Sequence, residues 1–552
     1  MTTTTPTPPA ARRQPQAAAA EHGTRAGVWW RAYRHHLRLA RNSAIAWIAG
    51  LTGISAGVVL TVEDRIGTEA ERQALAAMEG IPAFEALSGR FVQVATAEGF
   101  VLSRWGMFGI LAAVWAMLAA IKLLRGAEES GHAELLRAGT LTPRGLLASA
   151  LAALATWFAI FAVAIGASHS AIGMDVATAW ALGGAAALLA ATFAAAGALT
   201  SQLAATRRRA VGLAGAFLGV TLAVRVLAAA TFTPEWVWWA TPFGWMGFLH
   251  EVDESRTLVF TGFAVLLLAI VAAAFALAQR DLHAGLVGSR EERVARARPV
   301  RRQAGLALRL TTEITRMWAF IIAVVVASLG LLARDFIEAV QELATMVELV
   351  DELFGMVLDT PEGMLGTIFF FVAVLLAVAA AGQTAAIREE EASWRIEHLL
   401  VRPVSRARWL VTRVLVSAAG LLALAVGGGI VGWAATGLSG TPVALGDAVL
   451  AGVNVLPVAL LALGVGVAVF GLVPRLTAPL TYGVVVVAFL LDFVGPFLDL
   501  PQWVLDLSPF QHLASAPAVD MNVGAAWVML AVGLLAGIVG VLAFTRRDLR
   551  EA

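Results

Sequence analysis

Cysteine is absent from the 552-residue chain, and lysine and tyrosine are nearly so. Without cysteine, no disulfide framework, thiolate nucleophile or cysteine-ligated metal site can form. Lys122 is the only lysine, and Ile121 precedes it, so the chain has no Gly-Lys-Ser/Thr loop of the kind that cradles nucleotide phosphates. Nucleotide hydrolysis by such a loop is therefore excluded for this chain.

Charge is also scarce. Only 14% of the residues are Asp, Glu, Lys or Arg, whereas 59% are hydrophobic and the mean hydropathy is +0.77. A chain this apolar cannot cover itself with a water-compatible surface, which excludes a soluble globular protein. Apolar stretches of roughly 18 to 25 residues, the length of a spanning helix, recur along it and predict an all-α integral membrane protein. About twelve spans are expected, near 44–62, 100–123, 146–168, 178–203, 209–231, 257–279, 317–333, 365–386, 409–434, 446–472, 477–496 and 524–544.

Arginine clusters in alternate connections between these spans, and acidic residues cluster in the others. By the positive-inside rule, the arginine-rich connections and both termini face the cytoplasm. Residues 1–27 mix Thr, Pro, Ala and Arg without an apolar run, which indicates a disordered cytoplasmic tail and not a signal peptide. On the external side, segments 64–98 and 335–363 have helical periodicity and are expected to form helices on the membrane surface or against each other.

The chain contains an internal duplication. Adding 267 to the residue numbers carries 234–237 (PEWV) onto 501–504 (PQWV), and 280–282 (RDL) onto 547–549 (RDL). Because each half has six spans, both halves start on the same side, and a pseudo-two-fold axis along the membrane normal relates them. A pathway between the halves is the natural consequence. The predicted organisation is a tail, a first half, a basic cytoplasmic linker and a second half, at residues 1–27, 28–283, 284–303 and 304–552.

Two cytoplasmic segments match in the duplication, one after the second span and one after the eighth. They read AEESGHAELLRAGTLTPRGLL and EEEASWRIEHLLVRPVSRARWL, and each is expected to form an amphipathic helix, a turn and the start of the next span. The second resembles the cytoplasmic connection of the ABC-2 class of ABC transporter permeases, which has an acidic start, a Glu-Leu-Leu-Leu core and a Thr-Pro-Val-Ser-Arg turn. The first departs from that pattern at residues 139–144.

In that family, this connection is a coupling helix that sits in a cleft of the ATPase subunit and passes on its closure. A merely solvated helix face is the alternative for the acidic residues, and their duplication at matching positions favours coupling. The resemblance implies that the ATPase-coupling residues are Glu128, Glu134, Leu136, Glu391, Glu397, Leu399, Arg402, Pro403, Ser405 and Arg406.

The resemblance covers nearly the whole chain after the tail. It implies the ABC-2 permease fold, similar to that of type V exporters, with an elbow helix in the arginine-rich segment before the first span. It also implies two separately encoded ATPase subunits, which carry ATP and magnesium, and no cofactor in this chain. The chain looks like bacterial permeases identified as polyketide-antibiotic or multidrug exporters. The expected location is the bacterial cell membrane, and the expected contacts are lipids and a hydrophobic or amphipathic cargo, without nucleic acid.

In the family, the second, fifth, eighth and eleventh spans line the pathway. The apolar side chains that those spans offer here suit a large, mostly apolar ligand. Packing between helices or contact with lipid is the alternative for any single one of them. The candidate pathway residues are Met107, Phe108, Trp115, Phe217, Phe370, Phe371, Phe489 and Phe493.

Four residues are candidates for an outer gate. Arg225 and Asp492 occupy equivalent positions near the outer ends of the fifth and eleventh spans. Lone charges at that depth are costly, so the hypothesis is that they pair across the axis; separate snorkelling to the interface is the alternative. Trp236 and Trp503 fall in segments that the resemblance identifies as short re-entrant helices, or they are ordinary interfacial aromatics.

Two other functions remain open. A proton-driven secondary carrier also favours twelve spans in parallel halves, but the chain has few membrane-centre carboxylates for a proton relay. A membrane-embedded lipid-modifying enzyme, such as a lipid-linked glycosyltransferase, needs catalytic carboxylates and usually a metal site in its outer loops. The outer acids here lie at helical spacing among apolar residues.

Overall fold

The computed structural model describes residues 25–65, 69–76, 79, 85, 89–90, 92–129, 131, 133–134, 141–229, 234–250, 254–278, 303–342, 359–392, 405–495 and 500–547. These residues form helices and no strand. Among them, twelve helices are long and apolar enough to cross a membrane, which confirms the predicted number. In the first half these are α1 (Arg25–Arg65), α4 (Ala97–Ile121), α7 (Pro143–Ala171), α8 (Val176–Leu203), α9 (Arg207–Ala229) and α11 (Glu254–Leu277). In the second half they are α12 (Gln303–Leu331), α15 (Pro361–Ala392), α17 (Arg406–Ser439), α18 (Leu445–Asn454) with α19 (Leu456–Leu472), α20 (Thr477–Val494) and α22 (Val523–Arg546).

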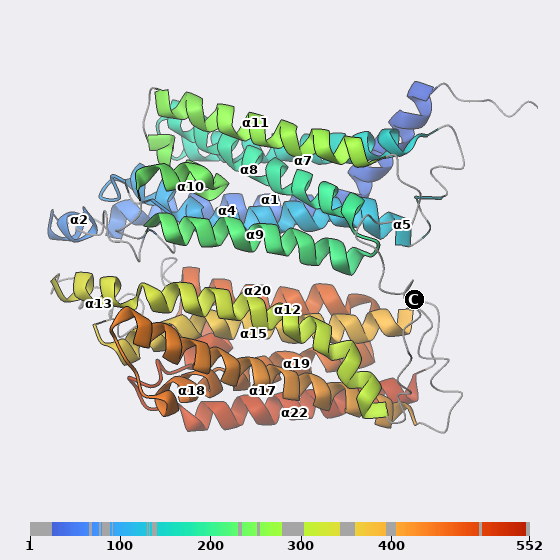
Figure 1. Cartoon of the computed structure of the whole chain (residues 1–552), viewed down its shortest axis with the longest axis vertical. Helices are drawn as coiled ribbons and strands as arrows, with labels where there is room; N and C mark the ends of the chain where they lie inside the picture. Colours follow the sequence, from blue (N-terminus) through green and yellow to red (C-terminus); the bar gives the residue numbers. More distant parts are fainter. Residues whose placement is uncertain are drawn as a thin grey trace, which may run out of the picture.

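The spans of each half form one bundle, and the two bundles lie side by side (Figure 1). In the first bundle, α8 packs against α4, α7 and α11, and α1 packs on α7. In the second, α19 packs against α15 and α22, and α17 packs on α12. Helix α9 of the first bundle contacts α12 of the second, and Arg208 of α9 makes an ion pair with Glu313 of α12 at 3.0 Å.

Small residues allow the central helices to approach closely. Lipid tails are as apolar as the helices, so association in a membrane depends on tight packing and interhelical hydrogen bonds. A Cβ atom on Gly197 of α8 would lie 2.6 Å from the carbonyl oxygen of Met117 in α4, so only glycine fits there. Gly464 and Gly471 of α19 face the backbone of α22 in the same way. Helix α8 also has seven alanines that are at most 1% exposed among the helices packed around it: Ala179, Ala185, Ala186, Ala190, Ala194, Ala195 and Ala198.

Short helices occupy the connections at the end of the bundles that was predicted to be external. Within the two predicted external segments, α2 (Glu69–Ala76) and α13 (Ala333–Glu342) are helical, as the periodicity predicted, and residues 343–358 lie outside the described residues. Between α9 and α11 lie η2 (Glu235–Ala240), α10 (Pro242–Trp245) and η3 (Met246–His250), and between α20 and α22 lie α21 (Gln502–Leu505) and η6 (Pro509–His512). Residues 241–249 are all buried, so the first of these connections is folded into its bundle. The matching short helices agree with the duplication.

The expected elbow helix is not a separate element. The arginine-rich segment before the first span is the beginning of α1, which runs without interruption from Arg25 to Arg65. No proline and no glycine occur between Gly27 and Gly50, so nothing in the sequence ends the helix before the span. The amphipathic residues form a helix, as predicted, and its role as an elbow stays a prediction.

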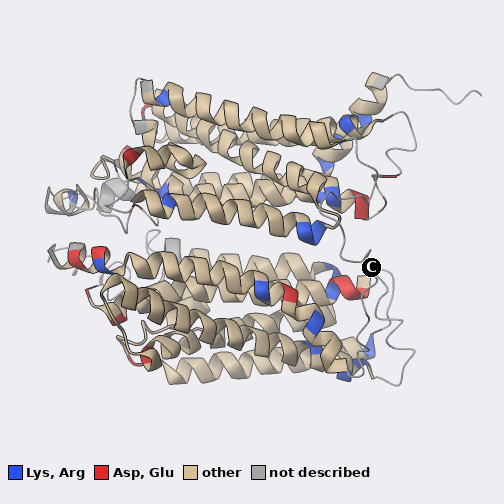
Figure 2. Cartoon of the chain, in the orientation of Figure 1, with Lys and Arg blue, Asp and Glu red and all other residues tan. Residues whose placement is uncertain are grey.

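The charged residues follow the predicted alternation. Figure 2 shows Lys and Arg gathered mainly at the end of both bundles where α5 (Ala127–Glu129) lies. This is the end that the positive-inside rule assigns to the cytoplasm. The placement of both termini in the cytoplasm stays a prediction, because the structure contains no membrane.

The close contact between α19 and α22 generates a stability prediction. A Cβ atom on Gly471 would overlap the carbonyl oxygen of Gly540. The variant Gly471→Ala should therefore lower the free energy of unfolding by about 1 to 3 kcal/mol through overpacking. Thermal unfolding of the purified protein in detergent measures this change.

The matched control is Gly427→Ala in α17, where a Cβ atom meets no atom within 4 Å. Alanine favours a helix over glycine, so this control should unfold at the same temperature as the native chain or slightly higher. Equal thermal midpoints for the two variants would show that the α19–α22 contact is not as tight as described.

Candidate functional site

The two predicted coupling segments follow α4 and α15. Helix α4 continues through a π-helical turn, η1 (Lys122–Gly126), into α5, whereas α15 is α-helical up to Ala392. A π-helical turn changes the direction in which the following residues point, and such turns are frequent at functional sites. The two segments therefore leave their bundles from differently built helix ends.

The turn that ends each segment is a helix N-cap. The Thr142 hydroxyl accepts a hydrogen bond from the backbone amide of Gly145 at 3.0 Å, at the start of α7. The Ser405 hydroxyl accepts one from the amide of Arg408 at 3.3 Å, at the start of α17. Thr142 and Ser405 match in the duplication, so these residues fix where the third and ninth spans begin.

The predicted coupling acids Glu128 and Glu391 lie in intramolecular ion pairs. Glu128 is 8% exposed and pairs with Arg125, one helical turn earlier. The Glu391 side chain is 7% exposed and pairs with Arg388, again one turn earlier, at 3.4 Å. The two Arg-x-x-Glu pairs occupy matching positions in the duplication. These carboxylates hold the base of each segment in place, and the sequence interpretation missed both arginines.

Glu391 is the centre of a larger cluster, which we call the Glu391 cluster and which comprises Glu391, Arg388, Arg406 and Arg547. Arg547, just after α22, donates to the Glu391 carboxylate at 2.8 Å, and its guanidinium lies over the rings of Phe470 and Phe544. Arg406, at the start of α17, donates to the Arg547 carbonyl at 2.8 Å. Arg388 also donates from Nε to the carbonyl of Pro474 at 3.1 Å. The cluster ties the ends of α15, α19 and α22 to the beginning of α17.

The first coupling segment is joined to α9, the fifth span, by a hydrogen bond. The Glu129 carboxylate accepts a hydrogen bond from the backbone amide of Arg207 at 2.5 Å, which satisfies an amide at the start of α9. The side chain of Glu134 is exposed, as a residue that contacts a partner must be. Five other predicted coupling residues lie outside the described residues: Leu136, Glu397, Leu399, Arg402 and Pro403.

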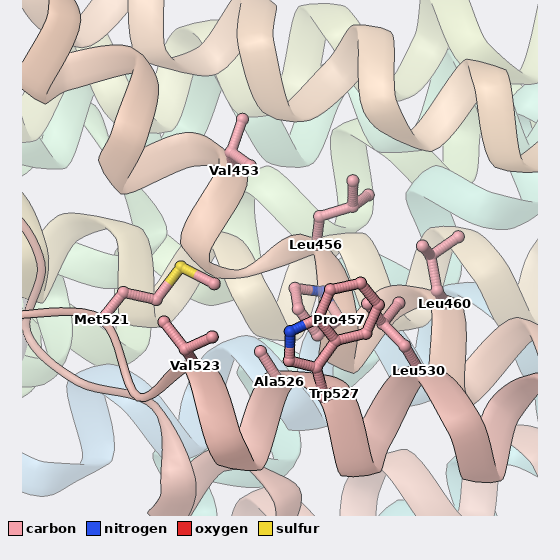
Figure 3. A pocket seen from close by; sticks show the side chains of 9 residues that line it. All are labelled: Val453, Leu456, Pro457, Leu460, Met521, Val523, Ala526, Trp527 and Leu530. Atoms are coloured by element: carbon pink, nitrogen blue, oxygen red, sulfur yellow. The ribbon is translucent and has the colours of Figure 1, made fainter.

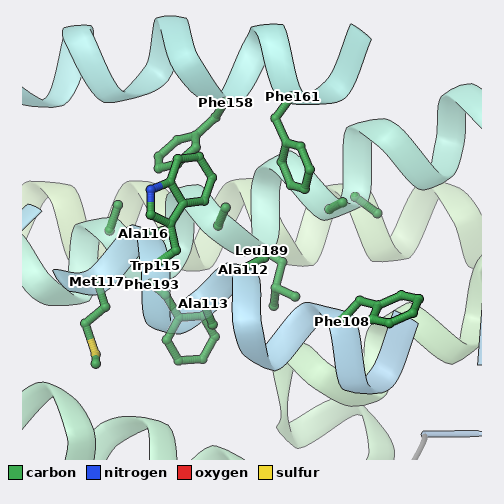
Figure 4. Packing of buried hydrophobic residues seen from close by; sticks show 14 of the residues in the cluster. Phe108, Ala112, Ala113, Trp115, Ala116, Met117, Phe158, Phe161, Leu189 and Phe193 are labelled. Atoms are coloured by element: carbon green, nitrogen blue, oxygen red, sulfur yellow. The ribbon is translucent and has the colours of Figure 1, made fainter. Parts of the chain in front are cut away.

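Two of the predicted pathway residues belong instead to the core of the first bundle. Trp115 is 3% exposed and meets Phe158 and Phe161 edge to face, with ring centroids 5.5 and 6.0 Å apart (Figure 4). Phe108 is 5% exposed and packs edge to face on Trp105. The Trp115 ring joins α4 to α7, whereas Phe108 and Trp105 both belong to α4. At this burial, neither predicted residue is available to a ligand in this structure. An aromatic residue in a spanning helix does not reveal by its identity which face it occupies.

The other predicted pathway residues are more accessible. Met107, Phe217, Phe370, Phe371 and Phe489 are partly buried, and the side chain of Phe493 lies outside the described residues. Phe217 contacts Phe193 with ring centroids 5.5 Å apart, and Phe370 contacts Phe371 at 5.6 Å. A role for them in the pathway stays a prediction.

The predicted outer pair is not formed. Arg225 is 3% exposed, donates from Nη1 to the Gly106 carbonyl at 2.7 Å, and lies over the Phe243 ring. Among the ion pairs between described residues, none joins Arg225 to Asp492. The guanidinium is turned into its own bundle, where a backbone carbonyl and a ring compensate for its burial.

The two tryptophans predicted near the outer gate are highly exposed. Trp236 in η2 is 67% exposed and Trp503 in α21 is 69% exposed. Their matching exposure follows from the duplication and suits contact with the interfacial region of a membrane. A gating role for them stays a prediction.

One apolar cavity lies in the second bundle, on the helix break between α18 and α19. It has a volume of about 280 Å³ and its walls come from these two helices and from α22 (Figure 3). Within the described residues, no three His, Asp or Glu side chains gather closely enough to hold a metal ion. The cavity is lined by Val453, Leu456, Pro457, Leu460, Met521, Val523, Ala526, Trp527 and Leu530.

Comparisons with known proteins give a consistent result. The sequence model of a family described as multidrug efflux system permease Rv1217c, C-terminal domain, matches residues 35–277 and 300–545, one range for each bundle. The multidrug efflux system permease protein Rv1217c of Mycobacterium tuberculosis (strain ATCC 25618 / H37Rv) is 28% identical to the chain over 529 residues. The alignment covers 94% of this chain and 94% of that protein.

The Glu391 cluster generates a prediction about stability. Glu391→Gln leaves the guanidinium groups of Arg388 and Arg547 near each other without their shared counter-charge. Loss of one partner from a buried ion pair destabilises a protein by about 3 to 5 kcal/mol, so the variant should unfold at a clearly lower temperature.

Glu235→Gln is the matched control, because Glu235 pairs with Arg90 at 2.8 Å but its side chain is 69% exposed. An exposed pair contributes about 0 to 1 kcal/mol, so this control should unfold like the native chain. A Glu391→Gln variant that is as stable as the control would rule out the cluster as an anchor.

Proposed function

Because the chain belongs to the family of the multidrug efflux system permease Rv1217c and is an ABC-type multidrug permease, we propose that it exports its cargo with a separately encoded ATPase. The proposed complex has one copy of this chain and two copies of the ATPase, one at each coupling segment. ATP and magnesium bind to those subunits, and this chain contributes no catalytic residue. The cargo is a hydrophobic or amphipathic compound such as an antibiotic, a drug or a lipid-like molecule.

The observation that carries the proposal is the construction of the two segment bases. Each segment leaves a spanning helix at an Arg-x-x-Glu pair, which is buried in the first segment and partly buried in the second, and enters the next span at a Thr or Ser cap. A segment that is fixed at both ends transmits a displacement to its bundle instead of absorbing it. The exposed carboxylate of Glu134 supports contact with a partner at the first segment.

The proposed location is the bacterial cell membrane, with both termini in the cytoplasm. The end of the bundles that carries the arginines also carries both segment bases, so a cytoplasmic ATPase would reach both. Membrane lipids surround the bundles, whose outer faces carry many exposed apolar side chains.

The ATPase is tested by purifying the tagged chain from its native membrane and identifying the proteins that accompany it. We expect a P-loop ATPase at two copies for each permease chain, with hydrolysis stimulated by lipophilic compounds. Glu134→Arg and Glu397→Arg should each weaken this association about a hundredfold or more, because charge reversal at an interface adds like-charge contacts that cost several kcal/mol.

Glu235→Arg, at the opposite end of the bundle, should leave the association unchanged and serves as the control. A chain that purifies without an ATPase and moves its cargo on a proton gradient would refute the proposal in favour of a secondary carrier.

The small contact between α9 and α12 allows a second test, which asks whether the two bundles must move relative to each other during transport. The chain has no cysteine, so two introduced cysteines are the only thiols in it with which a crosslinking reagent can react. In Arg208→Cys/Glu313→Cys, a cleavable bismaleimide should join α9 to α12 and stop transport, and cleavage should restore it. Transport is measured in vesicles before and after cleavage.

The two single-cysteine variants carry the same reagent without a crosslink and should transport normally. A crosslinked double variant that still transports at the native rate would mean that the bundles do not move at this point.

A further inference from the structure

The second bundle holds a buried ion pair besides the Glu391 cluster. Arg413 of α17 is 2% exposed and donates from Nη2 to the Glu390 carboxylate of α15 at 2.6 Å. Its Nη1 donates to the Ala307 carbonyl at 3.0 Å and to the Thr311 hydroxyl at 2.9 Å, both in α12. A single guanidinium thus joins three spans. Its donors lie on separate nitrogens in a planar fork, whereas the three donors of a lysine ammonium share one nitrogen.

The two residues of this pair flank the second coupling segment in the sequence. Glu390 belongs to the helix that leads into the segment, and Arg413 belongs to the helix that leaves it, 23 residues later. The two stems of the segment are therefore connected by a charge-assisted bond at its base.

The matching positions of the first half cannot form this ion pair. The offset that relates Arg125 to Arg388 carries Ala127 onto Glu390 and Ala150 onto Arg413. Both partners are absent together, as expected for a pair in which either charge alone is costly to bury. At this level the Ser149 hydroxyl meets Nδ1 of His36 at 3.2 Å, a contact that joins α7 to α1 and does not include α4.

The pair is also continuous with the contact between the bundles. Thr311, which accepts from Arg413, is two residues from Glu313, which pairs with Arg208 of α9 at 3.0 Å. Helix α12 is the element of the second bundle that packs on α9. A displacement of α15 and α17 that is passed to α12 therefore arrives at the boundary between the two halves.

We propose that Glu390 and Arg413 are positioning residues that make α12, α15 and α17 move as one body with the second coupling segment. This inference rests on the proposed ATPase. The closure of the ATPase then drives transport mainly through the second bundle, and the first bundle, with alanine at both positions, responds more loosely. The two coupling segments of this chain are consequently not equivalent.

The test uses the full chain in complex with its ATPase, in vesicles that contain a fluorescent lipophilic cation as cargo. Glu390→Ala/Arg413→Ala gives the second bundle the residues that the first bundle already has, so it leaves no unpaired charge. We expect it to fold and to hydrolyse ATP, while the cargo moved per ATP falls about tenfold, within the usual range of coupling between sites.

Arg413→Lys is the conservative variant. It keeps a positive charge beside Glu390, but its one nitrogen cannot occupy the positions of both Nη1 and Nη2, so the contacts with α12 and α15 weaken. This variant should also fold and transport less per ATP. The matched control is Arg334→Ala/Glu338→Ala, which removes a pair on α13 that has a similar distance, 2.7 Å, but is 59% and 58% exposed. This control should keep the native ratio of cargo to ATP.

The inference is overturned if both Glu390 and Arg413 variants move as much cargo per ATP as the native complex. It is also overturned if transport falls only in proportion to the amount of folded protein, because the pair then has a purely structural role. Failure of the underlying function has a different signature: the native chain itself would purify without an ATPase.

Discussion

A buried guanidinium keeps its charge, so it must keep an acceptor beside it, and the arginine-rich ends of both bundles are arranged around this requirement. Arg125 and Arg388 each have a carboxylate one turn away, Arg547 shares Glu391, and Arg225 at the other end uses a carbonyl. Each pairing also fixes the position of a helix end. The bases of the two predicted coupling segments are thereby held by charge-assisted contacts.

Between those charged ends, the bundles are held by close packing of small side chains. Glycine and alanine bring backbones together where Gly197 meets Met117 and where Gly471 meets Gly540. Such contacts have few alternative arrangements, so the packed helices within each bundle resist being displaced from one another. The contact between bundles is slighter: within the described part of the chain, α9 packs on α12, Leu332 joins the hydrophobic core of the first bundle, and the ion pair of Arg208 with Glu313 is largely exposed to solvent. Two tightly packed bundles with a small interface are suited to rigid-body motion of one half relative to the other.

The sequence predicted what depends on composition and repetition. Hydropathy located the twelve spans, and the duplication located the segments that Thr142 and Ser405 terminate. Prediction from the sequence failed where the result depends on which face of a helix a residue occupies. Trp115 was assigned to the pathway and lies in the core, and Arg225 was paired with Asp492 but turns to Gly106. Arg125 and Arg388 were overlooked because arginine at the inner end of a span is expected from the positive-inside rule alone. Comparing the halves residue by residue would have shown that each precedes a glutamate by three positions.

The replacement of Glu390 and Arg413 by Ala127 and Ala150 in the other half has a consequence for how such a chain evolves. In a symmetric homodimer, every substitution appears twice and any residue on the axis meets its own copy. Two bundles in one chain are free of that constraint, since each position is inherited once. One half can then specialise in receiving mechanical work while the other drifts toward a different task, such as tolerating varied cargo. A mutation selected by one drug changes only one half of the transporter and leaves the matching position of the other half unchanged.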